Sequence, residues 1–125
     1  MTDREMLELA AKAGGYARHE YVENSARDGR VVTGHYDSLL EVCINPLTDD
    51  GDALRLAVQL MIRVSVNRAF RLSIPGSVTV EYPDRDGFYV ALGEAVTNGD
   101  PYAATRRAIV RAAAEIGRQM EESND

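Results

Sequence analysis

Several residue types that usually carry structural or chemical information are scarce in this sequence. Cysteine occurs once, at Cys43, so no disulfide can form within the chain. No apolar run approaches the roughly 18–20 residues that a membrane-spanning helix needs. The opening residues, 1–5, are polar and acidic, whereas a secretory signal starts with basic and then apolar residues. These absences predict a protein of the cytosol.

An excess of positive charge is also missing. The chain carries 20 Asp and Glu residues against 14 Lys and Arg, which gives a formal net charge of -6 and a pI of about 4.9. Such a balance repels the phosphate backbone of nucleic acids and the anionic surface of membranes. Direct nucleic-acid binding and membrane binding are therefore disfavoured, and a protein is the expected partner.

The remaining composition is that of an ordinary globular chain. Hydrophobic residues make up 45% and charged residues 27% of the 125 residues, which argues against disorder. Because compact domains usually run to about 100–150 residues, a second core would have too little chain. We expect a single domain over 1–125, with a frayed tail at 121–125.

The segment 2–13 has helix signals at both of its ends. Thr2 followed three residues later by Glu5 is a capping box, which satisfies free backbone N–H groups of the first turn. Gly14-Gly15 then supplies a left-handed stop. We expect a short helix that packs on another element.

The segment 53–64 is the most apolar helical stretch. One of its faces carries Leu54, Ala57, Val58, Met61 and Ile62, and further apolar residues widen this stripe. A helix that is apolar over so much of its surface is usually buried. We expect this helix to form the centre of the core.

A third helix is predicted from Asp100, its cap, to about Glu121, with proline in its first turn. One side carries Tyr102, Ile109, Ala113, Ile116 and Met120, and the opposite side carries an arginine edge of Arg107, Arg111 and Arg118. The spacing predicts i,i+4 pairs of Arg111 with Glu115 and of Arg118 with Glu122. A solvated, salt-bridged face is favoured, and a grip on a phosphate or an acidic partner is the alternative.

Six segments are rich in β-branched and aromatic residues and predict strands. They are 16–23, 31–36, 39–44, 70–74, 78–82 and 88–92, with a turn at 24–29. The first alternates poorly and could instead cross the fold irregularly. The loop 83–87 ends in Gly87 and indicates an antiparallel hairpin with this glycine at positive φ. The pattern predicts an α+β fold, with an antiparallel sheet packed by three helices as an α/β/α sandwich.

Motifs of catalysis and of cofactor binding are missing from the chain. It has no phosphate loop, dinucleotide glycine fingerprint, nucleophile elbow or paired-histidine metal helix. His19, His35 and Cys43 match no zinc spacing, and Cys43 is expected to be a small buried hydrophobe. The sequence thus predicts no metal, no cofactor and no catalytic residue.

The acidic loop Asp49-Asp50-Gly51-Asp52 is the densest polar cluster. It does not fit a calcium-binding register, because Gly51 at the sixth position of such a loop makes Pro46 the first ligand. We expect Asp49 or Asp50 to cap the helix that follows and the other carboxylates to complement its dipole. A contact with a ligand or a partner is the alternative.

Three further stretches point to a known family. They are 2–13 (TDREMLELAAKA), 45–58 (NPLTDDGDALRLAV) and 100–117 (DPYAATRRAIVRAAAEIG), of which the second is the most specific. They resemble the phage α/β/α sandwich domain, a family of small proteins of tailed phages and prophages, although Ile44 stands where members often have tryptophan. The resemblance implies a phage or prophage origin and a sandwich of helices around an antiparallel sheet. It implies no known activity.

Three hypotheses of function follow. The first is a small accessory phage protein in the host cytosol that acts without catalysis by binding a host or phage macromolecule, for example to inhibit host antiviral defence. The second is a binding protein for a small, nucleotide-like ligand, or a hydrolase, with a pocket near His35, Tyr36 and the Asp49–Asp52 loop, because a histidine beside a carboxylate supports acid–base chemistry. The third is a homo-oligomer that assembles through an exposed sheet edge.

Overall fold

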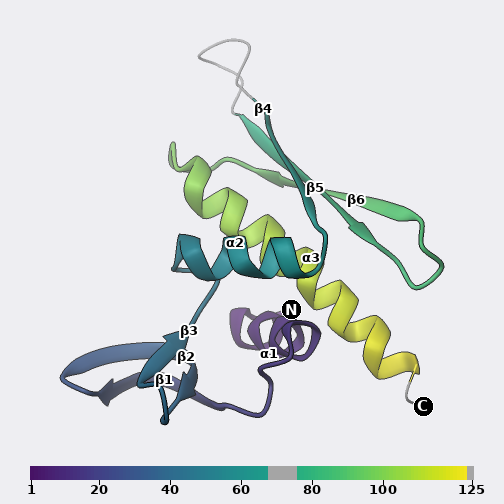
Figure 1. Cartoon of the computed structure of the whole chain (residues 1–125). Helices are drawn as coiled ribbons and strands as arrows, with labels where there is room; N and C mark the ends of the chain where they lie inside the picture. The colour runs from purple at the N-terminus through teal and green to yellow at the C-terminus, as the bar shows by residue number, and fades with distance from the viewer. Residues whose placement is uncertain (68–75, 124–125) are drawn as a thin grey trace.

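The structure is a computed structural model that describes residues 1–67 and 76–123. Its elements follow in the order α1 (Asp3–Gly14), β1 (Glu20–Arg27), β2 (Arg30–Asp37), β3 (Val42–Ile44), α2 (Asp50–Gln59), β4 (Arg63–Asn67), β5 (Ser77–Pro83), β6 (Tyr89–Ala95) and α3 (Pro101–Ser123), as Figure 1 shows. The expected strand at 70–74 lies outside the described residues. Within the described ranges, no helix has the length and apolar character needed to cross a membrane.

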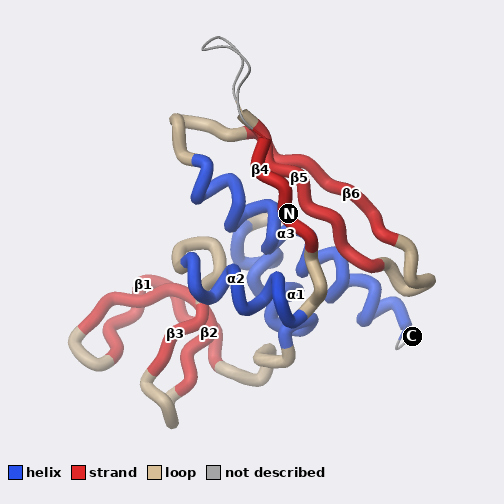
Figure 2. Tube along the Cα trace, turned by 45° about the horizontal axis from the view of Figure 1, so that its top comes forward, coloured by secondary structure: helices blue, strands red, loops and turns tan. Residues whose placement is uncertain are grey.

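The α+β class is confirmed, with antiparallel strands and three helices that pack against them in the described residues. The strands form two sheets instead of the one sheet that was expected. Sheet A has the order β1-β2-β3, and sheet B has the order β4-β5-β6. In Figures 1 and 2 the helices lie between the two sheets. This layer order differs from a sandwich of helices around a single sheet.

The ends of α1 are as the sequence predicts. The Thr2 hydroxyl accepts the Glu5 N–H at 3.1 Å, and the Glu5 carboxylate reaches back to the Thr2 N–H, which completes the capping box. Gly15 adopts φ 82° as the left-handed cap residue. The side chains of Met6 and Leu7 are buried against the core. The helix packs on α3.

Sheet A begins later and turns more tightly than expected. The segment 16–19 is not a strand, and β1 instead continues through most of the expected turn 24–29. The reversal uses Asp28 and Gly29 alone, both at positive φ. Asn24 is also at positive φ within an irregularity of the β1–β2 pairing. Polar residues that are typical of turns here form a bulge inside a strand.

The end of α2 was predicted wrongly. The expected helix 53–64 begins earlier, at Asp50, and stops at Gln59. Met61 takes φ 58°, the Ile62 N–H donates to the Ala57 carbonyl at 2.9 Å, and the Met61 N–H donates to the Val58 carbonyl. These two bonds form a Schellman stop. The residues 63–67 then become strand β4, which the apolar periodicity concealed.

The core is built mainly on α3 rather than on α2. The buried residues of α3 are Ala104, Ala108, Ile109, Val110, Ala112, Ala113, Ala114 and Gly117. Most are small, so α1 approaches closely on one side of α3 while β5 packs against it as well. The Asp100 carboxylate accepts the N–H groups of Tyr102 and Ala103, which confirms the predicted cap. The expected frayed tail is helical as far as Ser123.

The hairpin of β5 and β6 is confirmed. Buried and more exposed residues alternate along β5, with Val78, Val80 and Tyr82 facing the core. Its loop ends in Gly87 at φ 85°. Sheet B therefore covers α3 with one face of β5, and it leaves β4 and β6 as its two edges.

Candidate functional site

The acidic loop is occupied by structural contacts. The Asp49 carboxylate accepts the Asp52 N–H at 2.9 Å and caps α2, which confirms the expected cap. Asp52 is buried, where it accepts the Asn45 N–H at 2.9 Å and an Arg55 N–H at 2.6 Å. Both carboxylates are therefore engaged in contacts that hold the start of α2 in place.

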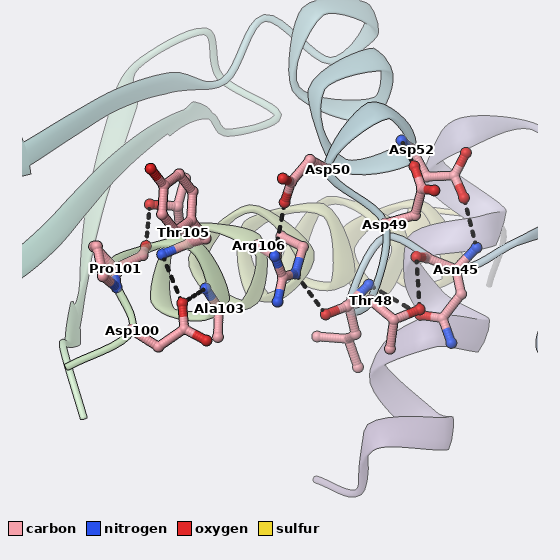
Figure 3. A network of polar contacts seen from close by, with 12 residues as sticks. Asn45, Thr48, Asp49, Asp50, Asp52, Asp100, Pro101, Ala103, Thr105 and Arg106 are labelled. Atoms are coloured by element: carbon pink, nitrogen blue, oxygen red, sulfur yellow. Dashed lines mark hydrogen bonds and ion pairs between the residues drawn. The ribbon is translucent and has the colours of Figure 1, made fainter. Parts of the chain in front are cut away.

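Arg106 joins this loop to α3. Its guanidinium donates to the Leu47 carbonyl at 2.9 Å and pairs with the Asp50 carboxylate at 2.7 Å. Figure 3 shows the pair of Arg106 with Asp50. The sequence interpretation named Arg107 and missed Arg106. A signal was present, because Arg106 lies one turn before the buried Ile109 and Val110 and so points toward the core side of α3.

The arginine edge of α3 is neutralised within the chain. Arg118 pairs with Glu122 as predicted, and also with Glu115 at 2.9 Å. The expected Arg111–Glu115 pair is replaced, because Arg111 pairs with Glu94 of β6.

Arg107 makes long-range contacts of the same kind. It lies 3.1 Å from an Asp3 carboxylate oxygen and 3.7 Å from one of Glu94. The edge thus ties α3 to α1 and to sheet B. These contacts agree with the solvated, salt-bridged face that the sequence favoured for the arginine edge.

His35 and Tyr36 lie on β2 in sheet A. The His35 ring is buried edge-to-face between Tyr16 and Tyr21, with both centroid distances 5.4 Å. Burial lowers the pKa of His35, while the nearby Glu8 carboxylate raises it and His19 lowers it. The Tyr36 hydroxyl donates to Asp28, and this hydrogen bond raises the pKa of Tyr36.

The structure does not gather these groups around the acidic loop. Asp49 and Asp52 line a cavity of about 420 Å³ together with Arg30 and Arg55, and neither His35 nor Tyr36 lines it.

Cys43 borders the same cavity and is only partly buried. Burial raises the pKa of its thiol, which keeps the sulfur protonated at neutral pH. In the described part of the chain, no three His, Cys, Asp or Glu side chains gather as a metal site would require.

An apolar groove lies between α2, β4 and α3. Its volume is about 540 Å³, and its apolar lining comes from Ala53, Leu54, Ala57, Val64, Val66, Pro101, Tyr102 and Ile109. The charged residues in the lining are Asp50 and Arg106, which pair with each other. The groove therefore presents an apolar surface, and none of its described lining residues carries an unpaired charge.

The apolar stripe of α2 continues this groove into solvent. Leu54 and Val58 of α2 are 62% and 71% exposed, and Met61, in the turn that follows the helix, is 69% exposed, although the sequence predicted that these residues would be buried. The prediction was wrong because α2 turns Ala53, Leu56 and Ala57 toward the core. Tyr102 was also expected on a buried side and is 69% exposed at the rim of the groove.

Strand β4 forms the third wall and an open edge. It pairs with β5 on one side and has no strand on the other among the described residues. All five of its residues are exposed, and Val64 and Val66 line the groove. It contains no proline and no bulge, the devices that commonly block edge pairing. We call the groove, the exposed residues Leu54, Val58 and Met61, and this edge the α2–β4 face.

Comparison of the chain with family models, with curated proteins and with solved structures found no match. The resemblance to the phage family therefore stays an expectation from the three sequence segments.

Proposed function

We propose that this chain is a non-enzymatic protein-binding module and that the α2–β4 face is its binding surface. The observation that carries the proposal is the exposure of one continuous apolar surface contributed by three elements. Full burial of a Val, Leu or Met side chain contributes about 1.5–3 kcal/mol, so a partner that covers this surface gains several such contributions. Surfaces of this kind mark sites of protein interaction.

The chemistry of the face favours a protein over other partners. A nucleic acid needs clustered cationic side chains, and the groove lining has one arginine, which Asp50 neutralises. A small polar ligand needs several free polar groups that converge on it, but Asp50, Arg106 and Thr105 of the groove lining already bond within the chain. An apolar protein segment requires neither.

The resemblance to phage proteins supports a proposal about where this binding takes place and for what purpose. We place the chain in the host cytosol as an accessory phage protein that binds a phage or host protein, with inhibition of an antiviral defence protein as its role. Its net charge of -6 keeps it in solution and away from nucleic acids.

Site-specific photo-crosslinking in the producing cell tests the surface directly. A photoreactive residue at position 58, on the exposed face of α2, is expected to form a covalent adduct with another protein chain. Position 39 is the matched control, because Leu39 is 92% exposed and lies in the turn between β2 and β3. Absence of a protein adduct at 58, or equal adduct formation at 39 and 58, would contradict the proposal.

A further inference from the structure

We infer that the partner of the α2–β4 face in the free protein is a second copy of this chain, joined edge to edge at β4. This inference rests on the proposed function and names the first protein that occupies the α2–β4 face. The two copies pair antiparallel about a two-fold axis at Ser65 and join two copies of sheet B into one. Such an interface is isologous, with each copy offering the same surface.

The sequence of β4 is self-complementary in this register. Val64 of one copy lies opposite Val66 of the other, and Arg63 lies opposite Asn67. Directly opposite residues of an antiparallel pair project from the same side of the sheet, so all four valines lie on the groove side. Opposed β-branched pairs stabilise a sheet, and no like charges face each other across the strands.

The exposed side chains provide enough surface for such a dimer. Leu54, Val58, Met61, Val64, Val66 and Tyr102 together expose on the order of 600–700 Å², polar atoms included, which is comparable with the largest apolar patch of a typical monomer. Each partner of a standard protein interface buries about 800 Å². The paired backbone of the two β4 edges adds to the side-chain area, so the dimer reaches this size.

The charge of the face permits self-association despite the acidity of the chain. Arg106 neutralises Asp50 inside the groove, and Arg55 pairs with the buried Asp52 at 2.6 Å on α2. Arg63, at the start of β4, stacks over the Tyr89 ring 3.8 Å from its centroid. The face itself therefore does not carry the negative excess of the chain, and two copies meet without concentrated repulsion.

Analytical ultracentrifugation of the full chain, from about 1 µM to about 500 µM, tests the dimer. The wild type is expected to shift from monomer to dimer across this range. Val58→Lys is expected to raise the dissociation constant about tenfold or more, because it adds a charge to the exposed stripe of α2 that each copy of the dimer covers. Since Val58 is exposed in the single chain and lysine favours helix, the variant still folds. Leu39→Lys is the matched control and should dimerise as the wild type does.

Disulfide trapping tests the register. In a Cys43→Ser background, Ser65→Cys should form an intermolecular disulfide on mild oxidation, because opposed residues lie about 4.5–5.5 Å apart between Cα atoms, within disulfide reach. Ser77→Cys on the inner strand β5 is the control and should not crosslink.

Two results would overturn the inference. One is a wild type that remains monomeric at the highest concentration. The other is a dimer that is unaffected by Val58→Lys and does not crosslink through Ser65→Cys. The proposed function fails separately: a monomer whose position 58 crosslinks to a different protein keeps that function and loses the second copy as partner.

Discussion

His35 makes the stability of the chain depend on pH. Its ring is buried between two tyrosines, so its pKa lies below the ordinary value near 6.5. The unfolded chain therefore binds the proton more readily than the folded chain does. The stability that belongs to neutral His35 is fully present above pH 6.5 and is lost as the pH falls below that value. Glu8 opposes this shift and His19 reinforces it.

Urea unfolding at pH 7.5 and at about pH 5.5 measures this contribution, because most carboxylates stay ionised in that window. The wild type is expected to have a lower free energy of unfolding at the lower pH, and His35→Gln should lose most of that difference. His19→Gln should retain most of it, because burial is the largest cause of the shift and His19 a smaller one. A wild type of equal stability at both pH values would show that His35 does not titrate as its burial requires.

At the scale of the elements, the crossing of α1 and α3 depends on Gly117. A Cβ atom at this position would lie 2.1 Å from the Leu9 carbonyl oxygen, which is backbone and cannot move aside cheaply. Glycine to alanine inside a helix normally stabilises by about 1 kcal/mol. Gly117→Ala should instead destabilise by about 1–3 kcal/mol, because the helices must separate.

Thermal or urea unfolding measures the effect of this substitution. Gly93→Ala in β6 is the matched control, since a Cβ atom there meets nothing within 4 Å, and its effect should stay within about 0.5 kcal/mol. If Gly117→Ala raised the free energy of unfolding, the close approach of α1 and α3 would be wrong.

The sequence predicts the elements where local signals decide them. The capping box of α1, the cap of α3 and the Gly87 hairpin are set by a few adjacent residues, and all three are present. The end of α2 was missed because Met61 takes a left-handed conformation without glycine, so no stop signal interrupts the apolar periodicity. The division into two sheets was missed because strand pairing joins segments far apart in the sequence.

The candidate site could not be predicted for a related reason. An apolar stripe such as Leu54, Val58 and Met61 indicates that a helix face is to be covered, but it does not say whether the cover comes from the same chain. The acidic loop attracted attention because charge is visible in a sequence. In the structure Asp49 and Asp52 cap and anchor α2, while the groove is built mainly from apolar residues of the kind that a sequence predicts to lie in the core.

At the scale of the whole molecule, apolar surface is exposed in more than one place. Leu39 and Leu40 protrude from the turn between β2 and β3, and Phe88 is exposed near the tip of the β5–β6 hairpin. Each of these belongs to a single turn. The α2–β4 face instead joins a helix, a strand edge and the start of α3 around one groove. This continuity distinguishes the α2–β4 face, the proposed protein-binding surface, from the two exposed turns.

Methionine oxidation footprinting in the producing cell tests this assignment most directly. In the single chain Met61 is 69% exposed and Met120 is 40% exposed, so an uncovered protein would oxidise Met61 faster. If a protein covers the α2–β4 face, the order reverses and Met61 reacts more slowly than Met120. Oxidation of Met61 ahead of Met120 in the cell would contradict the central claim that this face binds a protein.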